Sequence, residues 1–190
     1  MENFEKEYNA LCEKDVDNLW RIHVFFQSHP RLQSFMSSIV SKHPWYDVCA
    51  IIWIIVIIGC IEIGSKHFWV VTINVFASFI ARGLIQAKRP VEYDIKLQPL
   101  CDLGDESFGF PSLESYMSIV IIGHFFVTFS NNIIFIVLWI PTSTAIVAVV
   151  GISRLYAKSR FPHQVLGSWV LGIVGLLSAV SICDNWGIHL

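Results

Sequence analysis

The segment VCAIIWIIVIIGC, residues Val48 to Cys60, is the longest unbroken apolar stretch of the chain. Extended at both ends it predicts a membrane span from Trp45 to Gly64, because a helix needs about 20 mostly apolar residues to cross a bilayer. The sequence therefore predicts an all-α, polytopic transmembrane helical bundle of about five spans. The other four predicted spans are Phe68 to Ile85, Pro111 to Phe129, Ile133 to Ile152 and Phe161 to Cys183.

The composition supports a membrane protein. Apolar residues make up 54% of the chain and charged residues 15%, whereas soluble domains carry about 25% charged residues. A net charge of −2 gives no indication of a nucleic-acid partner. The cysteines are scattered without paired spacing, so we expect small buried thiols and neither a disulfide framework nor a metal site. No cofactor and no cleavable signal peptide are expected.

The region before the first predicted span has a different pattern. Residues Leu19 to Val40 mix large apolar side chains with Arg21, His23 and Arg31. This stretch is too polar to span, and it predicts an amphipathic helix at the membrane interface, broken at Pro30. We therefore divide the chain into an N-terminal amphipathic, interfacial region, 1–43, and a membrane domain, 44–190.

Five spans place the N-terminal region and the loops 86–110 and 153–160 on one side of the membrane. Every Lys and Arg of the chain except Lys66 then lies on that side. The positive-inside rule predicts that this side is cytoplasmic.

Three polar clusters lie at the ends of predicted spans on this shared side. They are Arg82-x6-Arg89-Pro90, then Phe110-Pro111-Ser112-Leu113-Glu114-Ser115, and finally Ser153-Arg154 followed by Arg160-Phe161-Pro162-His163-Gln164. Guanidinium groups form bidentate, charge-assisted hydrogen bonds with phosphate oxygens. A serine at a helix start adds a hydroxyl beside backbone N–H groups that favour anions. Together they predict a phosphate-binding site formed by Arg82, Arg89, Ser112 and Arg154.

These clusters resemble the three motifs of the type 2 phosphatidic acid phosphatase and glucose-6-phosphatase superfamily. Those motifs are K-x6-R-P, P-S-G-H and S-R-x5-H-x3-D. The segments CDLGDESFGFPSLESYMS (101–118) and ISRLYAKSRFPHQV (152–165) are most similar to the glucose-6-phosphatase branch. The resemblance implies a phosphatidic-acid-phosphatase-like core, a phosphorylated lipid or small molecule as ligand, and the endoplasmic reticulum membrane. It also implies a site on the lumenal or extracellular side, which disagrees with the charge count.

The chain departs from the motifs at the catalytic positions. Glu114 replaces the histidine that acts as general acid in the family, and Arg160 replaces the nucleophilic histidine. Gln164 replaces an aspartate that orients the nucleophile in the lipid phosphatases. Leu113 replaces a glycine that lets the ligand approach the backbone closely, and we expect the leucine side chain to crowd the ligand. A guanidinium stays protonated and has no lone pair for attack on phosphorus. We expect Glu114 and Arg160, opposite in charge, to form an ion pair across the former pocket.

Three functions remain open at the level of sequence. The first is a catalytically impaired relative, a pseudophosphatase, that binds a phosphorylated ligand. The second is an active membrane phosphatase with altered chemistry, and the third is a structural subunit with a vestigial site, held by membrane-protein partners.

Each candidate residue also has an interpretation without a site. Arg82, Arg89 and Arg154 are placed where cations snorkel to headgroups or anchor the topology. Ser112 is placed to cap a helix. His163 lies near Arg160, but we do not expect it to act as a substitute nucleophile.

Overall fold

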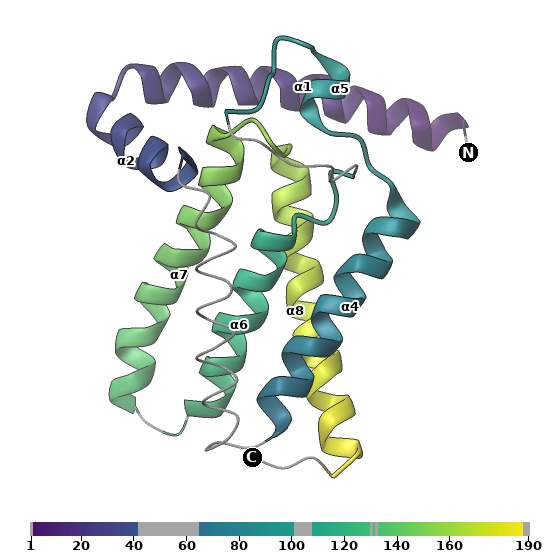
Figure 1. Ribbon diagram of the computed structural model, residues 1–190, viewed down its shortest axis with the longest axis vertical. Helices are drawn as coiled ribbons and strands as arrows, with labels where there is room; N and C mark the ends of the chain where they lie inside the picture. The colour runs from purple at the N-terminus through teal and green to yellow at the C-terminus, as the bar shows by residue number, and fades with distance from the viewer. Residues whose placement is uncertain (1, 42–64, 101–107, 130, 132, 188–190) are drawn as a thin grey trace.

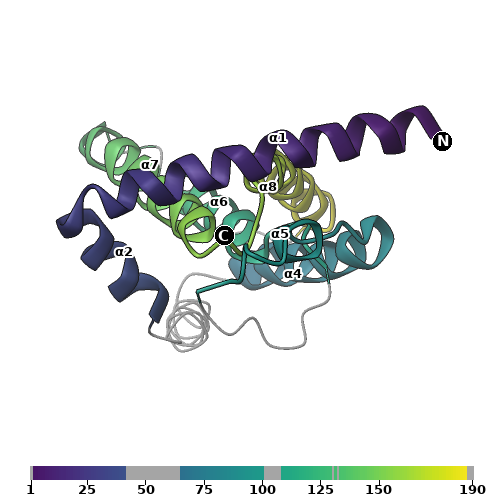
Figure 2. The same cartoon turned by 90° about the horizontal axis from the view of Figure 1, so that it is seen from above.

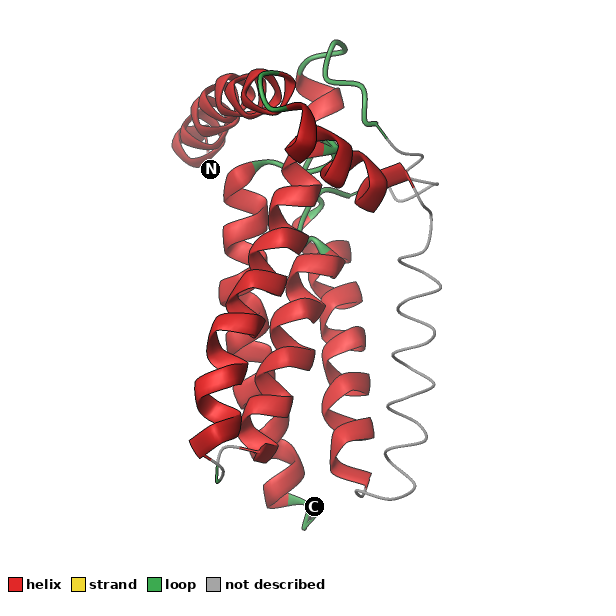
Figure 3. Cartoon of the chain, turned by 90° about the vertical axis from the view of Figure 1, so that its left-hand side faces the viewer, coloured by secondary structure: helices red, strands yellow, loops and turns green. Residues whose placement is uncertain are grey.

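The computed structural model describes residues 2–41, 65–100, 108–129, 131 and 133–187, and this part of the chain contains helices and no strand (Figure 3). The all-α prediction is confirmed. In Figure 1 the long helices α4, α6, α7 and α8 stand side by side, and α1 crosses one end of them. The helices are α1 (Glu2–Gln27), α2 (Pro30–Ser41), α4 (Ser65–Ile85), α5 (Pro90–Tyr93), α6 (Leu113–Phe129), α7 (Ile133–Tyr156) and α8 (Pro162–Asn185).

Four of the five predicted spans are observed as helices. Helices α4, α7 and α8 are long and apolar enough to cross a membrane, and α6 is a shorter apolar helix. The predicted span from Trp45 to Gly64 lies outside the described residues. Helix α7 continues past the predicted end at Ile152 to Tyr156, so Ser153 and Arg154 lie in its last turn and not in a loop.

The bundle is packed around α6 and α8. Its core contains Val70 and Val71 of α4, Val120 of α6 and Leu176 of α8. The outer faces carry exposed apolar side chains, such as Val137 of α7 at 63% exposed. Large apolar residues exposed in such numbers are characteristic of a surface that faces lipid. The chain is therefore an integral membrane protein, and the bilayer is its environment.

Polar contacts join the helices at mid-bundle and at the end far from α1. The Tyr116 hydroxyl donates to the Asn74 side-chain oxygen over 2.6 Å, inside the bundle. His124 forms a hydrogen bond with His67, as expected of a histidine between helices. The buried thiols Cys12 and Cys183 form no disulfide, and the described residues contain no group of three potential metal ligands.

The N-terminal region folds as a bent pair of helices. Helix α1 ends at Gln27 and α2 begins at Pro30, which confirms the predicted break. Helix α2 begins at the proline because proline is favoured in the first turn of a helix. Helix α1 begins at Glu2, well before the predicted stretch. Figure 2 shows it crossing over the ends of α7 and α8.

A close approach of α8 to its neighbours gives a test of this packing. A Cβ atom added at Gly175 would collide with the Tyr116 hydroxyl and the Asn74 side-chain oxygen, whereas a Cβ atom at Gly83 would meet nothing within 4 Å. We expect Gly175→Ala to lower the free energy of unfolding by about 1–3 kcal/mol through overpacking. The matched variant Gly83→Ala should leave it unchanged or raise it, because alanine favours helix. Thermal unfolding in detergent micelles measures both, and equal effects would contradict the packing.

Candidate functional site

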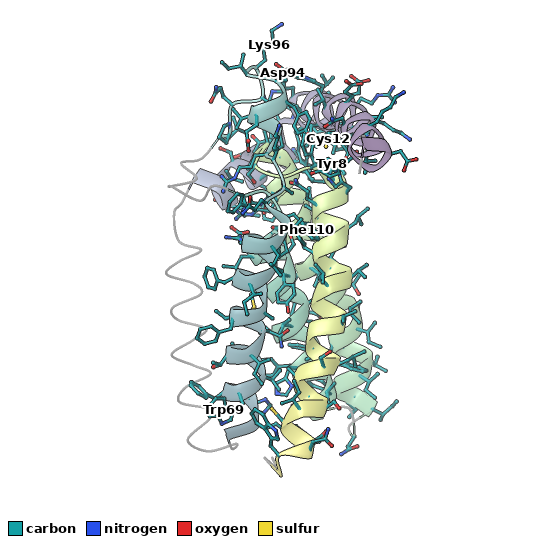
Figure 4. All side chains as sticks on the ribbon, turned by 90° about the vertical axis from the view of Figure 1, so that its right-hand side faces the viewer. Tyr8, Cys12, Trp69, Asp94, Lys96 and Phe110 are labelled. Carbon is teal, nitrogen blue, oxygen red and sulfur yellow. The ribbon has the colours of Figure 1, made fainter. Side chains whose placement is uncertain are left out.

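The three predicted clusters meet at the end of the bundle that α1 crosses. This end contains the C-terminal turns of α4 and α7 and the first turns of α6 and α8. Figure 4 places Phe110 here, beneath Tyr8 and Cys12 of α1, and Trp69 at the opposite end. Segments far apart in sequence are therefore neighbours in space, as the order of spans predicted.

Arg82 joins the first cluster to the second. It lies in the last turn of α4, and its Nε donates to the carbonyl of Pro111 over 3.0 Å. Arg89 immediately precedes the short helix α5, and its backbone N–H donates to the side chain of Glu92 over 2.8 Å. Both arginines are buried, so neither extends to a headgroup layer outside the fold.

Gln164 joins the first cluster to the third. Its amide nitrogen donates to the carbonyl of Lys88 over 2.8 Å, and its amide oxygen accepts from the backbone N–H of Phe161 over 3.2 Å. Gly109 also approaches this point, since its N–H donates to the Ala87 carbonyl over 2.6 Å. A Cβ atom at Gly109 would stand 2.7 Å from the Lys88 oxygen, so the glycine permits the two loops to touch.

Ser112 joins the second cluster to the third. Its backbone N–H donates to the hydroxyl of Ser168 over 2.7 Å, and that hydroxyl donates to the Gln164 carbonyl over 2.6 Å. The Ser112 hydroxyl lies 3.2 Å from Oε2 of Glu114 and 3.1 Å from the hydroxyl of Ser115. Ser112 immediately precedes α6, which begins at Leu113, and is completely buried.

Among the described residues, the ion pair of Glu114 is with Arg154 and not with the expected Arg160. Oε1 of Glu114 pairs with Nη1 of Arg154 at 3.2 Å, while Nη1 of Arg160 donates to the carbonyl of Phe108 over 3.2 Å. Arg154 reaches the carboxylate because α7 extends one turn further than predicted. The positive charges of Arg154, Arg160 and Arg82 all still act on the Glu114 carboxylate.

The site is closed in this conformation. Arg82, Arg89, Arg154 and Arg160 are each 8% exposed or less. Guanidinium groups gathered in such a place favour an anion strongly, because a buried charge needs a partner of opposite sign. Glu114 supplies such a partner for Arg154 from within the chain.

Leu113 and His163 both have structural contacts outside the phosphate site. Leu113 packs against the core cluster of Tyr116 and Met117, so its side chain has a packing role and crowding of a ligand stays a prediction. His163 contacts Asp15 of α1 through its ring Nδ1 at 2.6 Å, which gives it a structural partner.

Sequence analysis missed Gly109, Ser168 and Asp15. Ser168 lies four residues after Gln164, so helical spacing alone places it on the same face of α8. Gly109 precedes the second cluster, and only the approach of the Lys88 carbonyl explains it. Asp15 had no signal, because its partner is remote in sequence.

Comparison with known proteins gives one match. The family model described as the PAP2 superfamily matches residues 63–187, the part of the chain that holds α4 to α8 and all three clusters. No curated protein matches the chain and no solved structure does.

The cross-links through Gln164 lead to a prediction. Gln164→Ala removes the donor to the Lys88 carbonyl in a part-buried hydrogen bond, and we expect it to lower the free energy of unfolding by about 1–3 kcal/mol. Gln164→Glu should also destabilise, because a carboxylate cannot donate to that carbonyl. Gln27→Ala, at an exposed glutamine of α1, is the control. Unchanged thermal unfolding of both Gln164 variants would show that these bonds do not hold the loops.

Proposed function

The chain belongs to the PAP2 superfamily, and on that premise we propose that it is a pseudophosphatase. It binds a phosphate-bearing lipid or another phosphorylated ligand at the closed end of the bundle and does not hydrolyse it. Arg82, Arg89, Ser112 and Arg154 provide the phosphate contacts. No catalytic group is intact, since Glu114, Arg160 and Gln164 stand at the degenerate positions.

Phosphate binding is supported by the kind and placement of the polar groups. Arg82 and Arg154 belong to different helices, yet both positive charges act on the Glu114 carboxylate, and Arg154 pairs with it directly. Ser112 lies beside the same carboxylate. Guanidinium groups around one hydroxyl at a helix start match the oxygens of a tetrahedral anion.

Loss of catalysis is supported by the chemistry of two positions. Arg160 carries a permanent positive charge and cannot attack phosphorus. Glu114 accepts a charge-assisted hydrogen bond from Arg154, and an ionised carboxylate has no proton to give to a leaving group. Both chemical steps of a phosphoenzyme mechanism therefore lack their group.

Glu114 supplies the resting state of this proposed site. Its carboxylate takes the place beside Arg154 that a phosphate oxygen would take. Ligand binding then exchanges one anion for another, so affinity is lower than it would be for an empty cluster of arginines. Such a site stays folded without ligand.

We also propose a family branch, a cellular membrane and a position for the N-terminal region. Similarity of residues 101–118 and 152–165 supports the glucose-6-phosphatase branch and, with it, the endoplasmic reticulum membrane. For the N-terminal region, 1–43, we propose an interfacial position. Phe25 and Phe35 are 50% and 52% exposed close to the bend between α1 and α2, where aromatic side chains suit the headgroup layer.

The first test combines binding and hydrolysis. We expect the purified chain in nanodiscs containing phosphatidic acid to bind that lipid, and in detergent to bind inorganic phosphate. Arg154→Ala should weaken binding at least about tenfold, because a charge-assisted hydrogen bond is lost. Arg21→Ala, at an exposed arginine of α1, should leave binding unchanged.

The same preparations should release no phosphate from phosphomonoesters or lipid phosphates. Hydrolysis that disappears in Arg154→Ala would overturn the proposal in favour of an active phosphatase. Absence of binding in every preparation would favour a structural subunit.

A second test concerns the internal anion. Glu114→Gln removes the charge that competes for Arg154, with little change in size. We expect it to lower stability without phosphate and to increase phosphate affinity about tenfold, since a single competing charge is removed. Glu13→Gln, which removes an exposed carboxylate of α1, is the control for lost charge. Calorimetric titration with phosphate measures both, and weaker binding by Glu114→Gln would show that the carboxylate supports the ligand.

A further inference from the structure

The backbone N–H groups in the first turn of α8 need hydrogen-bond acceptors from outside the helix. Phe161 precedes the helix and provides no side-chain cap, and Pro162 has no N–H group. The first N–H groups of a helix have no partner within it and must find one elsewhere. Gln164 accepts from the N–H of Phe161, which leaves the N–H of His163 facing α1.

Asp15 of α1 occupies that position. One of its oxygens, Oδ2, accepts from the His163 N–H over 3.2 Å and contacts the His163 ring Nδ1 at 2.6 Å. Burial would raise the pKa of Asp15, but the hydrogen bonds from His163 and Asn18 outweigh it and hold the pKa below its usual value. An ionised carboxylate at a helix N-terminus is also favoured by the helix dipole.

Helix α1 is held firmly around this contact. Cys12 and Leu19 pack in one buried cluster with Leu97 and Phe161. Next to Leu19 on α1, the Trp20 ring lies beneath Lys158, whose Nζ is 4.6 Å from the ring centroid. These contacts lie on both sides of Asp15, at the bundle end where Figure 4 places Cys12. The carboxylate therefore has a fixed position over the start of α8.

We propose that Asp15 is a positioning residue for the phosphate site. It lies outside the family-matched residues 63–187, and it acts through His163. By capping α8, Asp15 fixes the segment from Arg160 to Gln164. Gln164 then holds the carbonyl of Lys88 through its amide nitrogen. The N-terminal helix thus completes a site whose ligand contacts all lie elsewhere. The inference rests on the proposed phosphate binding for its functional consequence alone.

Two substitutions in the full chain test the role. Asp15→Ala removes the cap, and Asp15→Asn keeps an oxygen that accepts from the His163 N–H. Asp17→Ala and Asp17→Asn are matched controls, because Asp17 is exposed on the same helix. Hydrogen–deuterium exchange of residues 158–165 reports the position of the turn, and titration with inorganic phosphate reports the site.

For Asp15→Ala we expect exchange in 158–165 about tenfold faster and phosphate affinity about tenfold weaker, the size of effect that loss of a helix cap produces. Asp15→Asn should recover most of both, and the Asp17 variants should match the wild type. Rescue by asparagine separates positioning from general damage to the fold. If Asp15→Ala does not fold, a measurable loss of protection confined to 158–165 in Asp15→Asn still supports the role.

Unchanged exchange in 158–165 for Asp15→Ala would overturn the inference. So would equal losses for Asp15→Ala and Asp17→Ala. If the wild type binds no phosphate, the proposed function fails by itself, and exchange still decides whether Asp15 fixes the turn.

Discussion

The guanidinium of Arg154 is buried at the end of an apolar bundle, and the Glu114 carboxylate 3.2 Å away makes that burial tolerable. Without an anion, a cluster of arginines in this position would repel itself and pull the helix ends apart. In the proposed function a phosphate lies among these arginines only while ligand is bound. Here the chain carries a permanent negative charge on α6, so the ends of α4, α6 and α7 stay together in its absence.

That constraint explains why the polar links around the site are so dense. The loops that carry the charges must stay fixed where water is excluded, so their backbone groups need partners of their own. Gln164 and Ser168 meet this need from one face of α8, reaching Lys88 and Ser112. Gln164, which the motif resemblance places where the lipid phosphatases carry an orienting aspartate, is here a cross-link between loops.

Much of this arrangement follows from sequence. Long apolar segments locate α4, α6, α7 and α8 because only a helix satisfies its backbone inside lipid. The order of spans then brings the three clusters to one end. What sequence could not settle was the partner of Glu114. The predicted span stopped at Ile152, where apolar residues end, but helical hydrogen bonding continues to Tyr156 and carries Arg154 inward. Arg160 lies outside α7 and turns to a backbone carbonyl instead.

Helix α1 shows a second limit and leads to the last step. Its buried residues Cys12, Asp15, Leu19 and Phe26 recur at helical spacing. The sequence did not predict this buried face, because an aspartate interrupts the apolar pattern. A buried aspartate has meaning only beside its partner, and His163 is 148 positions away. Because that partner belongs to the turn between Arg160 and Gln164, the boundary of the family match is not the boundary of the functional unit. Under the proposed function no covalent intermediate forms on the third motif, and the contact from Asp15, outside the matched residues, holds that segment in place.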